Sequence, residues 1–94
     1  MKGNSSFIVV IPARFGSKRL PGKPLKKILG LPMVIRTCIQ CLKVVKRSQL
    51  IVATDDIRIQ KCCEKYSINS MLTSKKCKTG TDRVAEVAKK IKVK

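Results

Sequence analysis

The chain has 94 residues, enough for one small domain, and its 22 Lys and Arg against 5 Asp and Glu give a net charge of +17. Such a charge usually indicates nucleic acid or an anionic membrane as a partner. Here the charge is mostly lysine spread along the chain, and three aromatic residues cannot build a stacking platform for bases. No apolar run reaches about 18 residues and no signal peptide is evident. We therefore expect a cytoplasmic chain with no specific nucleic acid and no membrane as partner.

The first half of the chain predicts a strand, a helix and a second strand. Residues 7–11 are rich in β-branched side chains and predict a buried strand. Pro32 suits the first position of a helix, which we expect to run to about Val45. Residues 50–54 predict the second strand. The expected apolar face of the helix carries Val34, Cys38, Cys41, Leu42 and Val45.

The second half predicts a helix, a weak strand and a longer helix. Asp55 and Asp56 suit the start of a short helix with Ile59, Cys63 and Tyr66 on one side. Residues 69–73 predict a weak third strand, and a last helix is expected from about residue 81. The apolar positions of the last helix are Val84, Val87, Ala88 and Ile91.

This alternation predicts an α/β fold, a Rossmann-like parallel sheet with flanking helices and the strand order 3-2-1. Because parallel strands end at one edge, the loop after the first strand, residues 54–55 and the turn at 79–83 should meet there. We interpret Asp55 as a helix cap or a loop organiser rather than a metal ligand. Asp82 is interpreted as a cap, with Thr79 at the N-cap position.

The loop after the first strand carries the clearest functional signal. Within ten residues it places four cations and two glycines: Arg14, Lys18, Arg19, Lys23, Gly16 and Gly22. Cations and free amides beyond the carboxyl end of a parallel strand favour a polyphosphate ligand. The glycines are separated by five residues and Pro24 follows the lysine, so this is not a Walker A loop. A basic surface turn is the alternative interpretation.

Histidine is absent, which excludes Ser-His-Asp and Cys-His catalysis and Cys/His zinc sites within this chain. Five cysteines are present: Cys38, Cys41, Cys62, Cys63 and Cys77. The C-x-x-C spacing of the first two could serve zinc or redox chemistry, but it falls in the middle of an expected helix and has no second copy. We therefore expect reduced thiols that behave as small apolar side chains.

Three segments carry a resemblance to a known family. They read IPARFGSKRLPGKPL at residues 11–25, IVATDD at 51–56 and TGTDRVAEV at 79–87. Together, and in this order, they resemble the sugar-activating cytidylyltransferases, most closely the 3-deoxy-manno-octulosonate (Kdo) cytidylyltransferases, or CMP-Kdo synthetases. Relatives that act on sialic acid share the Arg and Lys residues but usually differ around the first and last segments.

The resemblance implies transfer of CMP from CTP to Kdo with release of pyrophosphate, for lipopolysaccharide biosynthesis. It implies catalytic roles for Arg14 and Lys23, Mg²⁺ as cofactor, CTP and Kdo as substrates, and a homodimer. The nucleotide-binding residues that it implies are Ala13, Arg14, Ser17, Arg19, Lys23, Thr79, Gly80 and Arg83. For Arg83 an exposed surface cation is the alternative. Cys77 stands where these enzymes usually have a histidine, so the role of that imidazole is open.

The resembling enzymes are much longer than this chain. We therefore expect residues 1–94 to be the N-terminal nucleotide-binding part of such an enzyme, truncated before its metal-binding and sugar-binding segments. The Mg²⁺ ligands are then expected outside this chain. Three alternatives stay open: an inactive fragment of such an enzyme, an enzyme for another sugar acid of the sialic acid type, and a basic nucleic-acid-binding module.

Overall fold

The computed structural model describes residues 7–16, 22–74 and 80–91. Its strands are β1 (Val9–Ala13), β2 (Lys27–Ile28), β3 (Leu31–Pro32), β4 (Leu50–Thr54) and β5 (Ser70–Leu72). The α-helices are α1 (Met33–Cys41), α2 (Ile57–Lys65) and α3 (Gly80–Ile91), and two short 3₁₀ turns are η1 (Lys23–Leu25) and η2 (Arg47–Gln49). Among these described helices, none has the length and apolar character needed to cross a membrane.

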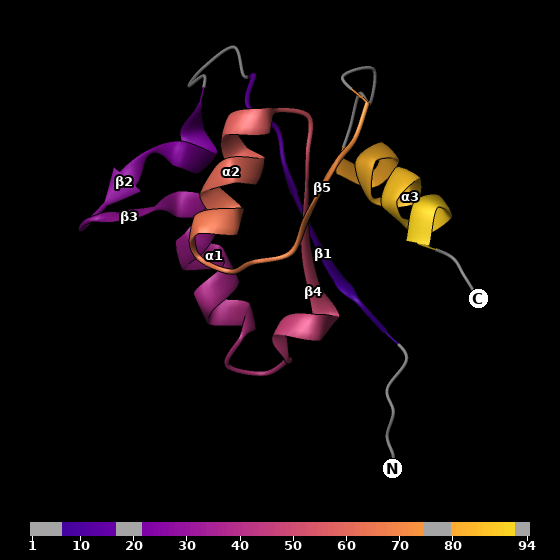
Figure 1. Cartoon of the computed structure of the whole chain (residues 1–94), viewed down its shortest axis with the longest axis horizontal. Coiled ribbons are helices and arrows are strands. Elements are labelled where there is room, and N and C mark those ends of the chain that lie inside the picture. Colours follow the sequence, from indigo (N-terminus) through magenta and orange to yellow (C-terminus); the bar gives the residue numbers. More distant parts are fainter. Residues whose placement is uncertain (1–6, 17–21, 75–79, 92–94) are drawn as a thin grey trace.

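The main sheet has three parallel strands in the order β1-β4-β5, which confirms the expected order 3-2-1. Val9 of β1 pairs with Leu50 of β4, and Thr54 of β4 pairs with Leu72 of β5. Helices α1 and α2 cover one face of the sheet and α3 covers the other (Figure 1). The three expected strands and the α/β class are thus confirmed, although β1 runs from Val9 to Ala13, two residues later than the predicted range 7–11.

The main core lies between the sheet and helices α1 and α2. Because side chains alternate along a strand, Leu50 and Val52 of β4 point to this face, while Ala53 points to α3. Each helix places a thiol in the core next to branched aliphatic side chains. The fully buried helix residues here are Ile35, Cys38, Ile59 and Cys63. The expected apolar faces of the first two helices are therefore confirmed in their central positions.

The first helix is shorter than its sequence predicts. It begins at Met33, because Pro32 lies in β3 and caps the helix, and it ends at Cys41 instead of Val45. The amides of Lys43 and Val44 donate to carbonyls three residues earlier, so the chain leaves the helix in tight turns. Two consecutive β-branched valines are poor helix formers and add little to hold another turn.

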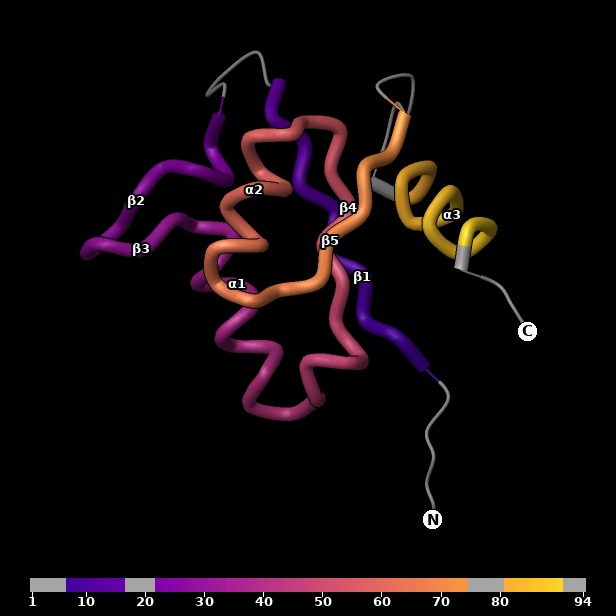
Figure 2. The backbone as a smooth tube through the Cα atoms, viewed as in Figure 1, coloured from indigo at the N-terminus to yellow at the C-terminus, as the bar shows by residue number. Residues whose placement is uncertain are grey.

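A small antiparallel hairpin, β2–β3, has no counterpart in the sequence prediction. Its two-residue turn uses Leu29 with φ 53° and Gly30 with φ 88°, the positive angles that a tight hairpin turn requires. The Arg36 Nε donates to the Ile28 carbonyl at 2.7 Å, and its Nη2 donates to the Leu29 carbonyl at 3.2 Å. Helix α1 therefore holds the hairpin, which extends away from the main sheet (Figure 2).

The last helix differs from its prediction in the residues that it buries. Helix α3 begins at Gly80, and Val87 is fully buried as expected. Ala88 is exposed, and the buried position one turn before Val87 belongs to Arg83, whose exposed fraction is 2%. Thr79, the expected N-cap, and Cys77 lie outside the described residues.

Candidate nucleotide-binding site

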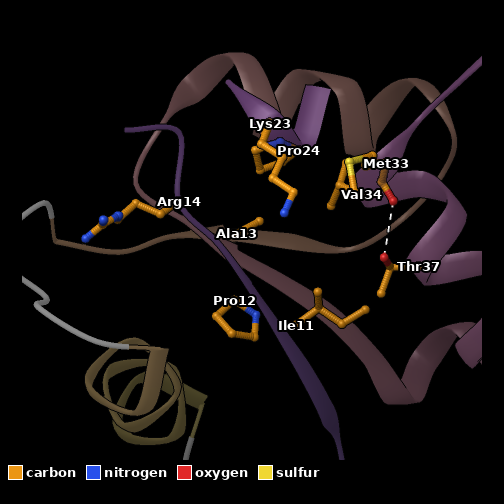
Figure 3. A pocket seen from close by; sticks show the side chains of 9 residues that line it. All are labelled: Ile11, Pro12, Ala13, Arg14, Lys23, Pro24, Met33, Val34 and Thr37. Atoms are coloured by element: carbon orange, nitrogen blue, oxygen red, sulfur yellow. Dashed lines mark hydrogen bonds between the residues drawn. The ribbon is translucent and has the colours of Figure 1, made fainter. Parts of the chain in front are cut away.

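A pocket of about 230 Å³ opens beside the carboxyl end of β1, between this strand, η1 and the first turns of α1 (Figure 3). Its lining comprises Ile11, Pro12, Ala13, Arg14, Lys23, Pro24, Met33, Val34 and Thr37. This is the edge at which a parallel sheet binds its ligands. The basic loop of the sequence therefore borders this pocket through Arg14 and Lys23.

Lys23 and Arg14, the two expected catalytic residues, point in different directions. The Lys23 amino group points towards Ala13 and into the pocket, while the Arg14 side chain runs away from Lys23 (Figure 3). The Arg14 Nε donates to the Gly16 carbonyl at 2.9 Å. The structure therefore brings Ala13 and the Lys23 ammonium together at the pocket, with the Arg14 guanidinium to one side.

The backbone that presents Lys23 depends on Gly22. This residue has φ 75°, and its amide donates to the Phe15 carbonyl at 2.7 Å. A Cβ at Gly22 would lie 3.2 Å from the Phe15 ring, in addition to the strain of a positive φ. Pro24 then fits the start of η1, where its missing amide is not needed. Glycine and proline thus set the direction in which the lysine leaves the loop.

Asp55 organises this loop from the neighbouring strand. Its Oδ1 accepts a hydrogen bond from the Phe15 amide at 3.2 Å, and its Oδ2 lies 3.9 Å from the Arg83 Nη2. The carboxylate is 10% exposed. The prediction of Asp55 as a loop organiser is confirmed, whereas the adjacent Asp56 serves as the N-cap of α2.

Arg83 is buried, and its two partners follow the carboxyl ends of β4 and β5. Its Nη1 donates to the Thr73 Oγ1 at 2.6 Å, and its Nη2 forms the ion pair with Asp55. The alternative of an exposed surface cation is therefore wrong. Its expected contact with a nucleotide stays a prediction, because the guanidinium is already engaged with protein atoms.

Sequence reasoning missed the apolar wall of the pocket. Met33, Val34 and Thr37 of α1 line it, and the Thr37 hydroxyl donates to the Met33 carbonyl at 3.2 Å. The sequence signal that could have predicted this wall is the helix that follows the basic loop, because such a helix packs against the strand that precedes the loop. Ser17, Arg19 and Thr79 lie outside the described residues, and Gly80 is the first residue of α3.

The acidic residues near the pocket do not form a metal site. Within residues 7–16, 22–74 and 80–91, no three His, Cys, Asp or Glu side chains gather in a group that could hold a cation. Asp55 binds the Phe15 amide and Arg83, and Asp56 binds Arg58 and the start of α2. The described residues therefore offer no group of three protein ligands, and the expectation that the Mg²⁺ ligands lie outside this chain stays a prediction.

Comparison with protein families matches residues 8–94 to the cytidylyltransferase family model. The chain belongs to the cytidylyltransferase family. A 3-deoxy-manno-octulosonate cytidylyltransferase of Polynucleobacter necessarius is 51% identical over 87 residues, which cover 93% of this chain and 34% of the relative. One of Zea mays is 42% identical over 87 residues, covering 93% of this chain and 29% of the relative. The resemblance carried by the three sequence segments is confirmed.

A solved structure supports the same assignment of the fold. It is a CMP:2-keto-3-deoxy-manno-octonic acid synthetase complexed with CTP, 39% identical to this cytidylyltransferase chain, with a TM-score of 0.88. The match covers 95% of this chain and 37% of that protein. The chain thus spans about a third of the length of these relatives.

Proposed function

We propose that this chain is the N-terminal nucleotide-binding part of an enzyme that activates Kdo with CTP to give CMP-Kdo and pyrophosphate. The observation that carries the proposal is the 39% identity and TM-score of 0.88 to a CMP-Kdo synthetase complexed with CTP. The pocket at the end of β1, with the Lys23 ammonium pointing into it, supports a role in binding the triphosphate.

In the proposed reaction the anomeric hydroxyl of Kdo attacks the α-phosphorus of CTP. An oxygen–phosphorus bond forms to the sugar, the bond to the β-phosphate breaks, and pyrophosphate leaves. The chain's part is to position the nucleotide and to offset negative charge. Lys23, Arg14 and Arg19 would bind phosphate oxygens.

Backbone groups and the last helix would complete the proposed nucleotide site. Ala13 and Ser17 would contact the nucleotide through the backbone of the loop. Gly80 and Thr79 would lie near the phosphates at the N-terminal end of α3, where helix amides favour anions. Arg83 is supported chiefly as the residue that holds Asp55, and through it the loop.

Mg²⁺ is proposed as the cofactor of the complete enzyme, where it would neutralise charge on the phosphates. Its ligands are expected in the part of the relatives that this chain does not span, because the described acidic residues already hold protein partners. A homodimer and a cytoplasmic location are also proposed.

A chimaera tests the proposed function. Residues 8–94 would replace the matching segment of the Polynucleobacter relative, so that the remaining two thirds complete the enzyme. With CTP, Kdo and Mg²⁺ the chimaera should release pyrophosphate, and without the sugar it should not. Turnover with sialic acid alone would contradict the assignment of the sugar, and a folded chimaera without turnover would contradict the function.

Substitutions in the chimaera test the loop. Arg14→Ala and Lys23→Ala should each raise the barrier by about 2 to 4 kcal/mol, as loss of a preorganised charge does in other enzymes. Lys18→Ala is the matched control, because it removes one charge from the same loop at a position with no proposed contact to the nucleotide, and it should cost far less. Equal kinetics for all three variants would mean that the loop is a basic surface turn.

A nucleic-acid-binding module is the second candidate, favoured by the net charge of +17. Displacement of a single-stranded oligonucleotide from the chain distinguishes the two. If the pocket is specific, CTP should displace it at lower concentration than ATP or GTP. Equal effects of all nucleotides, with a steep dependence on salt, would favour the second candidate.

A further inference from the structure

Phe15 connects three parts of the pocket's surroundings. Its amide donates to Asp55, its carbonyl accepts from the Gly22 amide, and its ring lies against the Gly22 backbone. Gly22 is followed directly by Lys23, whose ammonium points into the pocket. A displacement of Phe15 would therefore move the residue that sets the direction of Lys23.

The ring of Phe15 is held from outside by Arg58 of α2. The Arg58 guanidinium carbon lies 3.6 Å from the centre of the ring, the geometry of a cation–π contact. Phe15 is half-buried, so this contact covers a ring face that would otherwise meet water.

Arg58 is itself fixed, although its side chain is 60% exposed. Its Nε donates to the Asp56 Oδ1 at 2.9 Å, and its Nη2 donates to the Asp56 Oδ2 at 2.8 Å. The Arg58 backbone amide donates to the same Oδ1 at 2.8 Å. The hydrogen bonds to Asp56 raise the pKa of Arg58 above its ordinary value, which is already high enough to keep an arginine charged.

The bidentate pair fixes the plane of the guanidinium, and the helix cap fixes the carboxylate that holds it. Asp56 is 10% exposed and starts α2, directly after the sheet edge. Most exposed arginines sample many rotamers, and a surface ion pair alone does little to stop this. Here two parallel hydrogen bonds and the stacked ring act on one guanidinium, an arrangement that a lysine cannot reproduce.

We propose that Arg58 is a positioning residue that, by stacking on Phe15, keeps Gly22 and Lys23 in place beside the pocket. The expected effect of Arg58 on CTP binding rests on the proposed function, while its expected effect on the position of Gly22 does not. Arg58 does not line the pocket, and its stacking on Phe15 is the contact through which it reaches the loop. None of the three sequence segments that carry the family resemblance includes Arg58.

The test compares Arg58→Gln and Asp56→Asn with Lys61→Gln in the 94-residue chain. Glutamine keeps the three side-chain carbons up to Cδ and the backbone amide that donates to Asp56, but removes the guanidinium cation. Asparagine keeps a capping oxygen and removes the bidentate partner. Lys61 is an exposed cation on the same helix and is the control for the loss of one charge.

The first readout is the NMR shift of the two Gly22 Hα protons, measured without nucleotide. One of them occupies the position where a Cβ would lie 3.2 Å from the Phe15 ring, so the ring should separate their shifts. Arg58→Gln and Asp56→Asn should reduce this separation, while the signals of buried Val52 and Cys38 should not move. Lys61→Gln should leave all of these signals unchanged.

The second readout is the Kd for CTP, obtained by titration. Arg58→Gln should raise it by about two- to five-fold, as expected for loss of one exposed cation–π contact. Lys61→Gln should raise it less. Unchanged Gly22 shifts in both Arg58→Gln and Asp56→Asn would overturn the proposal, as would equal losses of affinity for Arg58→Gln and Lys61→Gln. A parent chain that binds no CTP would overturn the proposed function, and the Gly22 shifts would still decide the role of Arg58.

Discussion

The two faces of the main sheet are held by different chemistry. Between the sheet and α1 and α2 the contacts are apolar, and two buried thiols, Cys38 and Cys63, take places that aliphatic side chains could fill. On the α3 side the largest buried side chain is a charged one, Arg83, which binds Thr73 and Asp55. Apolar packing on the α1–α2 side stabilises the domain without requiring particular bond directions. On the α3 side, the hydrogen bond and the ion pair of Arg83 require specific distances and directions.

This difference explains how the site is organised. The apolar face supplies Met33 and Val34 as a wall of the pocket. The charged face extends from α3 through Arg83 and Asp55 to the amide of Phe15, and so reaches the loop that carries Lys23. Binding of a charged ligand should therefore depend on both faces, but changes to the charged face should displace the loop most directly.

Arg83→Met should give the largest loss of stability. It would remove from a buried region the cation that pairs with the Asp55 carboxylate and donates to the Thr73 hydroxyl, and breaking a buried pair typically costs about 3 to 5 kcal/mol. The measurement is urea unfolding followed by circular dichroism. Arg83→Lys, which keeps the charge, should lose less.

The control for Arg83 is a pair on the surface of the same helix. Lys90 lies 2.9 Å from Glu86, four residues earlier, and its side chain is 49% exposed. Lys90→Met should cost no more than about 0.5 kcal/mol. Comparable losses for Arg83→Met and Lys90→Met would contradict the distinction between the two faces.

Cys38→Ser should have a smaller effect, on the apolar face. Cys38 is fully buried among aliphatic side chains, and a hydroxyl there that finds no partner costs about 1 to 3 kcal/mol. Cys41→Ser, at a half-buried position on the same helix, is the matched control and should cost less. The free energy of unfolding is again measured in urea. A larger loss for Cys41→Ser than for Cys38→Ser would mean that the surroundings of the buried thiol are polar.

Alkaline pH should weaken the same face further, between about pH 9 and pH 11. Burial raises the pKa of Cys38 from 9.0 to about 11 and that of Cys63 to about 12. The unfolded thiols ionise first as the pH rises, so the unfolded chain binds fewer protons and stability falls above about pH 9. The melting temperature of a Cys38→Ala/Cys63→Ala variant should fall less over this range, and an equal fall would contradict the effect.

The sequence predicted the three parallel strands because runs such as residues 50–54 are mostly apolar and rich in β-branched side chains, and it predicted their order because helices alternate with strands. It also predicted Asp55 as a helix cap or a loop organiser, and the hydrogen bond to the Phe15 amide shows the second of these roles. The hairpin β2–β3 was missed because strands of two residues have no periodicity and Leu29-Gly30 is a weak turn signal.

Two features of the site could not be obtained from the sequence for physical reasons. The burial of Arg83 depends on Thr73 and Asp55, which are distant in sequence and come together only at the sheet edge. The direction of the Arg14 side chain depends on a local bond to the Gly16 carbonyl. Composition and spacing contain no information about either.

A titration of the isotope-labelled chain with CTP, followed through backbone amide shifts, tests the central claim most directly. Saturable changes should concentrate at Ala13, Lys23 and Thr37 around the pocket, at lower concentrations of CTP than of ATP or GTP. Residues on the far surface, such as Lys46 and Ser67, should not change. Shifts spread over the exposed lysines without saturation, and equal for all nucleotides, would contradict a specific nucleotide site at the end of β1.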